Sequence, residues 1–268
     1  MLTVNRTFLE NLYGRYNRRE FVRPDPLQFL YDYDDPCDRE IVGLIASSLA
    51  YGRVAQILRS VSDLLERMGR SPYSFLRRAS HKSLRRTFAD FRPRFTTGSE
   101  ICSVLVGVRR VIARYGSLSA CFASGLGDSG DTILPALSAF VKELAFGTNE
   151  HSNFLLPSPA KGSACKRLNL FLRWMVRQDA VDPGGWDNVP ACKLIVPLDT
   201  HMYRISLALG LTKRRQANMR TALQITSAFK EIAPEDPVRY DFALTRFGIR
   251  SDLGPSDLLK RRDASKAN

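Results

Sequence analysis

The chain has 268 residues, 44% of them hydrophobic and 25% charged, a balance that is typical of globular proteins and excludes wholesale disorder. Forty Lys and Arg against 27 Asp and Glu give a net charge of +13, so polyanions, above all nucleic acid, are the expected partners. The five cysteines form no CxxC pair, which argues against a disulfide framework or a zinc knuckle. With no signal peptide or long apolar run in the sequence, we expect a cytoplasmic protein that does not contact a membrane.

Hydrophobic residues recur with helical spacing from the beginning of the chain. Val4, Phe8 and Leu12 share one face, which predicts a first helix. Asp35-Pro36 is typical of an N-cap followed by proline at the first helical position, and it predicts a strongly apolar helix that ends before Tyr51. An amphipathic helix is expected over 54–68, with the following glycine as its C-terminal cap.

A capping box, Thr97 with Glu100, predicts the next helix. Further helices are expected over 132–146, 163–177, 199–209, 219–232 and 237–247, whereas 71–95 stands out only as rich in arginine and lysine. Loops are expected over 148–162 and 179–190, and strand patterns are scarce. The sequence therefore predicts an all-α fold of about ten helices in two packed lobes. These form a single domain over 1–255, with a basic, mobile tail over 256–268.

Two segments carry candidate chemistry, and the first is a Pro/Gly/Ser turn that leads into the helix KRLNLFLRWMVR. Lys166 lies in the first turn of this helix, where free backbone N–H groups suit a phosphate. The helix dipole and the neighbouring Arg167 would disfavour the charged form of the Lys166 amine. A lysine that acts as a nucleophile needs such surroundings, because only the neutral amine attacks. The alternative is a surface lysine that binds phosphate or water.

The second segment is the apolar run that ends in VPLDTH, residues 196–201. Asp199 begins a helix there, which by itself fits an ordinary N-cap. Together, the two segments resemble the helix-hairpin-helix superfamily of DNA glycosylases, in which a lysine follows the hairpin and an aspartate begins a later helix. LIASSLAYGR, residues 44–53, is similar to the first helix and DNA-inserting loop of these enzymes. The resemblance covers about residues 25–250.

The hairpin departs from the pattern of that superfamily. The usual Leu-Pro-Gly-Val-Gly-x-Lys is replaced by LPSPAKG with extra residues before Lys166, and Asp199 follows Lys166 by 33 positions, a long spacing. In hairpin and spacing the chain looks most like the archaeal 8-oxoguanine glycosylases. It is also similar to an uncharacterised bacterial family known only as a domain of unknown function, through KRLNLFLRWMVR, VPLDTH and DPVRYDFAL.

The resemblance implies an enzyme that removes a damaged base, such as 8-oxoguanine, from double-stranded DNA and then cuts at the abasic site. The base is swung out of the duplex, Asp199 stabilises the oxocarbenium-like sugar, and Lys166 forms a Schiff base before β-elimination. Lys161 is the rival nucleophile. A monomer that joins the nucleoid when bound to DNA is expected.

Further roles follow from the same resemblance. The expected DNA contacts are Tyr51, Gly52, Arg53, Lys161, Gly162, Ser163, Arg167 and His201. The expected base pocket consists of Arg173, Trp174, Trp186 and Asp241. Each has a plain structural alternative: residues 51–53 as a turn between helices, both tryptophans as core, and His201 as a residue bonded to local backbone.

No cofactor is expected. No cysteine follows Cys192, so the four-cysteine iron–sulfur loop of some members of the superfamily is absent, and the three histidines are too scattered for a metal site. Two other functions stay open: a non-catalytic helical module that binds nucleic acid through the hairpin, and a protein-interaction domain whose charge is incidental. The first predicts a Lys166 that is exposed and distant from Asp199.

Overall fold

The computed structural model describes residues 5–127, 130–146, 153–249, 253–254, 257–258 and 260. Its regular elements are helical, which confirms the all-α prediction, and the described residues contain no strand beyond one isolated bridge between Gln178 and Pro183. The α-helices are α1 Arg6–Tyr16, α2 Pro36–Ser48, α3 Val54–Met68, α4 Pro72–Arg78, α5 His81–Thr87, α6 Gly98–Tyr115, α7 Leu118–Ala123, α8 Leu134–Ala145, α9 Lys166–Val176, α10 Thr200–Ala208, α11 Met219–Lys230 and α12 Asp241–Ile249. Short 3₁₀ helices are η1 Arg19–Phe21, η2 Pro26–Asp32, η3 Pro159–Lys161 and η4 Ala191–Lys193.

Side-chain caps set several of the predicted helix ends. Asp35 accepts the N–H of Cys37 at 2.8 Å before α2, and Thr97 and Glu100 form the expected capping box of α6. Gly69, with φ of +78°, ends α3 in a backbone conformation that favours glycine. These ends were predictable because a cap satisfies backbone groups that the helix itself leaves unpaired.

The arginine-rich stretch 71–95 contains two helices that its sequence pattern does not predict. Ser71 caps α4 and Ser80 caps α5, each accepting a backbone N–H three residues on. Both helices have only seven residues, too few for apolar periodicity to stand out among the arginines. The last α-helix also begins later than expected, at Asp241 rather than at 237. Most of the expected tail, 256–268, lies outside the described residues.

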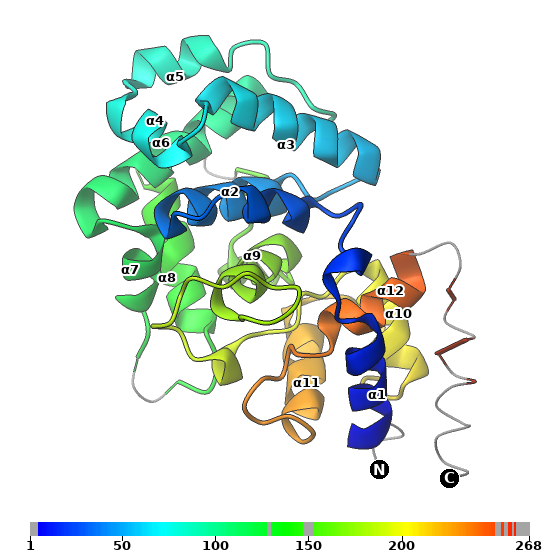
Figure 1. Cartoon of the computed structure of the whole chain (residues 1–268). Helices are drawn as coiled ribbons and strands as arrows, with labels where there is room; N and C mark the ends of the chain where they lie inside the picture. Colours follow the sequence, from blue (N-terminus) through cyan, green and yellow to red (C-terminus); the bar gives the residue numbers. More distant parts are fainter. Residues whose placement is uncertain are drawn as a thin grey trace.

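Helices α2 and α9 lie in the middle of the molecule (Figure 1). Figure 1 shows α3 to α6 on one side of them, and α1, α10, α11 and α12 on the other. Gly43 allows the two central helices to approach closely, because a Cβ there would lie 3.2 Å from Sδ of Met175 and 3.3 Å from Cδ2 of Phe171 on α9. This packing fixes α9, and with it Lys166 at its first position.

Candidate nucleic-acid site

The turn before α9 is built to place Lys166 at the first residue of the helix. Gly162 and Cys165 both adopt left-handed backbone conformations, with φ of +77° and +46°. The Cys165 thiol donates to the carbonyl of Pro157 at 3.4 Å, and its N–H donates to Oγ of Ser163 at 3.2 Å. The turn is therefore closed by its own hydrogen bonds, which hold the chain in place where it enters α9.

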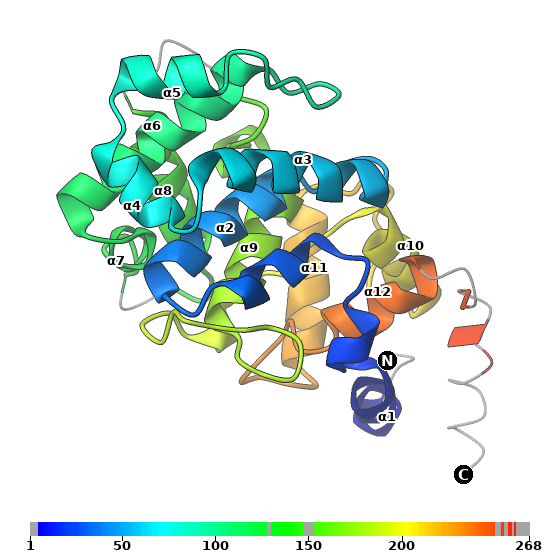
Figure 2. The ribbon, with the colours of Figure 1, turned by 45° about the horizontal axis from the view of Figure 1, so that its top comes forward.

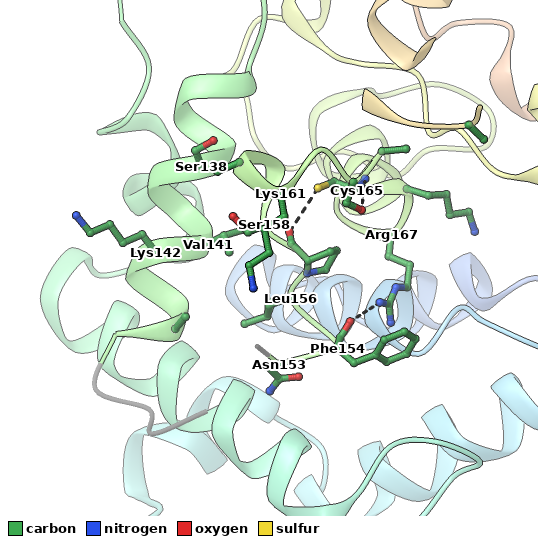
Figure 3. A pocket seen from close by; sticks show the side chains of 17 residues that line it. Ser138, Val141, Lys142, Asn153, Phe154, Leu156, Ser158, Lys161, Cys165 and Arg167 are labelled. Carbon is green, nitrogen blue, oxygen red and sulfur yellow. Dashed lines mark hydrogen bonds between the residues drawn. The ribbon is translucent and has the colours of Figure 1, made fainter. Parts of the chain in front are cut away.

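A cavity of about 1020 Å³ opens beside this turn, between α8 and the start of α9 (Figure 3). Among the described residues, the lining includes four with charged side chains, and all four are cationic: Lys142, Lys161, Lys166 and Arg167. Lys161 lies on the turn and Lys142 on α8, and Figure 3 shows the Lys142 side chain extending away from the other labelled residues. The described part of the lining thus offers positive charge and no carboxylate, which suits an anionic ligand.

Lys166 is half-buried, and its amine forms no hydrogen bond or ion pair with the described part of the chain. Lys161 lines the same cavity but is exposed. The structure therefore brings the predicted nucleophile and its rival to one cavity, together with Ser163 of the turn, while Gly162 does not line it. Lys142 was missed, since a lysine on the outer face of an amphipathic helix gives no sign that a cavity lies beside it.

Arg167 is committed to contacts within the protein. Its guanidinium donates to the carbonyl of Ser48 at 2.7 Å and to that of Phe154, and its Cζ lies 4.3 Å from the centre of the Phe154 ring (Figure 3). Burial lowers the pKa of Arg167. Arg167, which was expected to contact DNA, thus connects the end of α2 to the loop before α9, and we call these contacts the Arg167 clamp.

The predicted DNA-inserting loop lies next to this clamp. The Tyr51 hydroxyl hydrogen-bonds Thr96, and the ring meets Phe154 edge-on with centroids 5.3 Å apart. Gly52 has φ of +90°, and a Cβ there would lie 2.1 Å from Nη1 of Arg94. Arg53 is exposed. Tyr51 is therefore held by the protein, while Arg53 is accessible to a ligand.

Asp199 is the N-cap of α10 and does not line the cavity. Its Oδ1 accepts the N–H of Met202 at 2.8 Å, while Oδ2 has no hydrogen-bond partner within the described residues. His201 packs over α12, because a Cβ on Gly248 would lie 2.5 Å from Nδ1 of His201. The structure thus places Asp199 where the sequence predicts a cap, half-buried and outside the lysine cavity.

The four residues expected to line a base pocket are all buried, which differs from the expectation. Trp174 and Trp186 have no more than 1% of their surface exposed, and Trp186 Nε1 donates to Glu40 at 3.0 Å within the core. Arg173 contacts Asp182 at 3.1 Å and Asp241 at 2.5 Å. Both tryptophans are core residues in this structure, and Arg173 and Asp241 are partners of each other.

Arg173 belongs to a buried network of charges at the C-terminal half of α9. Arg177 contacts Asp182, and also Asp179 and Asp236 at 2.8 Å each. Burial raises the pKa of Asp241 to about 6 although Arg173 opposes the rise, and the negative charge of Asp199 adds to it. Asp199 therefore lies close enough to this network to act on Asp241 electrostatically.

Spacing along α9 relates Lys166 to that network. Lys166, Leu170, Arg173 and Arg177 follow one another at four, three and four residues, so they share one face of the helix. Seven residues correspond to about 10 Å along the axis. Arg173, which pairs with Asp241, therefore lies about two helical turns from Lys166 on the same face of α9.

Two expected absences concern metals and membranes. Within the described residues, no three His, Cys, Asp or Glu side chains are grouped in a way that would hold a metal ion. In the same part of the chain, no helix combines the length and the apolar character that a membrane span requires.

Comparison with known proteins identifies one family. Residues 25–250 match the model of a family described as a protein of unknown function, DUF2400. No curated protein and no solved structure matches the chain. The match spans most of the sequence, including α2, the cavity turn, α9 and α10. The chain belongs to this family of proteins of unknown function.

Proposed function

We propose that this chain is a DNA glycosylase with AP lyase activity, in which Lys166 is the amine nucleophile. The observation that carries the proposal is the half-buried Lys166 at the start of α9. It has no carboxylate partner among the described residues, and the charged side chains that these residues contribute to its cavity are all cationic. A lysine without a carboxylate partner keeps its amine available to a ligand, and an amine is the group that forms a Schiff base with the sugar.

The reaction follows from the chemistry of an amine and an abasic carbon. Cleavage of the N-glycosidic bond releases the base and leaves positive charge on the sugar, which the unpaired Oδ2 of Asp199 stabilises. The Lys166 amine bonds to C1′ and forms a Schiff base once the sugar ring opens. Loss of a proton from C2′ then breaks the C3′–O bond and cuts the strand. An oxidised purine such as 8-oxoguanine is the proposed substrate base, and duplex DNA the proposed partner.

One observation favours a second candidate, a non-catalytic module that binds nucleic acid. A non-catalytic module predicts that Asp199 is distant from Lys166, and Asp199 does not line the cavity of Lys166. The same cationic lining would hold a phosphate backbone without any chemistry on the sugar. The two candidates differ in one measurable respect, which is a covalent bond to DNA.

Borohydride trapping tests the proposal, because reduction converts the Schiff base into a stable adduct. Wild type is compared with Lys166→Gln, Lys161→Gln and Lys142→Gln on duplexes that carry 8-oxoguanine or an abasic site. We expect only Lys166→Gln to abolish the adduct. Lys142→Gln is the matched control, since it removes one charge from the same cavity lining.

Asp199→Asn separates the two steps. Asparagine caps helices as well as aspartate does, so α10 is expected to keep its start. We expect the variant to lose the adduct on the 8-oxoguanine duplex and to retain it on the abasic duplex, where the base is already gone. Salt-sensitive binding without any Lys166-dependent or Lys161-dependent adduct would replace the proposal with the non-catalytic module.

A further inference from the structure

Two loops that are distant in the sequence lie side by side near Arg167. The first is 51–53, and the second is 92–96, part of the loop between α5 and α6 that projects from the body of the molecule (Figure 2). Tyr51 hydrogen-bonds Thr96 and the carbonyl of Pro93, and Gly52 packs against Arg94. These contacts join both loops into one surface, which we call the double-loop face.

The aromatic ring that this face exposes belongs to Phe95. Phe95 is 68% exposed, more than any other large hydrophobic side chain that the structure describes, whereas Tyr51 is held by Thr96 and Phe154. Arg94 has φ of +55°, a conformation that non-glycine residues seldom adopt, and its guanidinium lies 4.9 Å from the Phe95 ring centre. The loop therefore presents an apolar ring to solvent at its tip.

The charges around Phe95 point to an anionic partner. Arg53, Arg92 and Arg94 are exposed and form no ion pair with any other described residue. Two carboxylates of the neighbouring segments, Asp63 and Asp90, both pair with Arg67. An exposed ring among unpaired arginines matches a nucleic acid, in which bases stack on aromatic faces while phosphates contact the arginines.

We infer that the double-loop face is a DNA-binding surface on which Phe95 stacks against the bases that flank an abasic gap. Arg53, Arg92 and Arg94 contact the adjacent phosphates. Tyr51, which the sequence suggested as the inserted residue, instead supports the loop that carries Phe95. The abasic gap is what base removal leaves in the duplex. The inference therefore rests on the proposed function for the origin of the gapped DNA, whereas binding of that DNA to the double-loop face does not depend on it.

The test measures the affinity of the full chain for two duplexes, one intact and one with a tetrahydrofuran analogue of an abasic site. Fluorescence anisotropy is recorded for wild type, Phe95→Ala, Phe95→Trp and Phe146→Ala. Phe146 is the matched control, because it is 67% exposed and also lies beside an arginine, Arg110. 2-Aminopurine next to the analogue reports stacking through its emission.

Stacking on one base contributes about 1–3 kcal/mol, which corresponds to roughly a 5- to 150-fold change in affinity. We expect Phe95→Ala to weaken binding of the gapped duplex by such a factor and to leave the intact duplex unchanged. Phe95→Trp and Phe146→Ala should bind both duplexes as wild type does. The change in 2-aminopurine emission on binding should disappear with Phe95→Ala and persist with the other two variants.

Equal losses on both duplexes, equal losses in Phe95→Ala and Phe146→Ala, or no loss at all would overturn the inference. Its failure is distinguishable from that of the proposed function. If Phe95→Ala weakens binding of the gapped duplex alone and no Lys166-dependent adduct forms, the double-loop face is upheld as a DNA-binding surface and the lyase is rejected. If the adduct forms and Phe95→Ala has no selective effect, only the role of the double-loop face is rejected.

Discussion

At the C-terminal half of α9, Arg173 and Arg177 are buried, and each contacts at least two carboxylates. At the N-terminal end of the same helix, Lys166 and the neighbouring Lys161 contact none within the described chain. Buried cations need partners because their desolvation is costly, whereas cations at a cavity can be left for a ligand. The difference indicates that one end of α9 stabilises the fold and that the other is available for binding.

The largest effect is expected at the paired end. Asp182 is fully buried and contacts both Arg173 and Arg177, so Asp182→Asn leaves two buried guanidinium groups short of a charge. Breaking a buried pair in this way costs about 3–5 kcal/mol of unfolding free energy. Urea denaturation measures the loss.

Asp63→Asn is the control for that measurement. Asp63 is a half-exposed partner of Arg67, and such surface pairs contribute about 0–1 kcal/mol. Similar losses in the two variants would mean that burial does not distinguish the network from an ordinary surface pair.

A pH dependence is expected from Asp241. Its pKa of about 6 lies above the ordinary value of 3.8, so between about pH 4 and 6 the folded protein binds a proton that the unfolded chain does not. The contribution of Asp241 to the unfolding free energy therefore falls as the pH rises through this window. We expect wild type to lose about 1–3 kcal/mol relative to Asp241→Asn between pH 4 and 7.

Urea denaturation of both proteins across this pH range checks the sign. A difference that stays constant, or one that grows in favour of wild type as the pH rises, would show that Arg173 keeps Asp241 ionised throughout.

The smallest effect on stability is expected at the unpaired end. Lys161→Gln removes an exposed charge without a partner in the described chain, so its unfolding free energy should stay within about 0.5 kcal/mol of wild type. Its binding to duplex DNA should weaken, and the slope of log affinity against log salt should become shallower by about 1.

Fluorescence anisotropy over a salt series measures that slope. If Lys161→Gln leaves the salt slope unchanged and lowers the unfolding free energy, then the N-terminal end of α9 stabilises the fold and is not a binding site.

The features that the sequence predicted depend on neighbouring residues. Asp35, Thr97 and Gly69 mark helix ends because caps act within a few positions, and Lys166 was placed at a helix start by the turn before it. The internal contacts of Arg167 could not be predicted, because its two carbonyl partners lie 119 and 13 residues away. No local pattern reports such contacts.

The missed features depend on tertiary packing. Trp174 and Trp186 carry the chemistry of a base-stacking residue, and only their burial shows that they belong to the core. Phe95 lay in a segment recognised solely by its charge, since the exposure of one ring at a loop tip leaves no periodic signal. The position of Asp199 beside the buried network likewise required the packing of α10 on α12.

The most direct test of the central claim is to locate the covalent bond. The protein is trapped with borohydride on a duplex that contains an abasic site, then digested, and the modified peptide is sequenced by mass spectrometry. We predict that the reduced sugar is attached to Nζ of Lys166. Attachment to Lys161 or to the terminal amine, or the absence of any adduct, would contradict the assignment of Lys166 as the nucleophile.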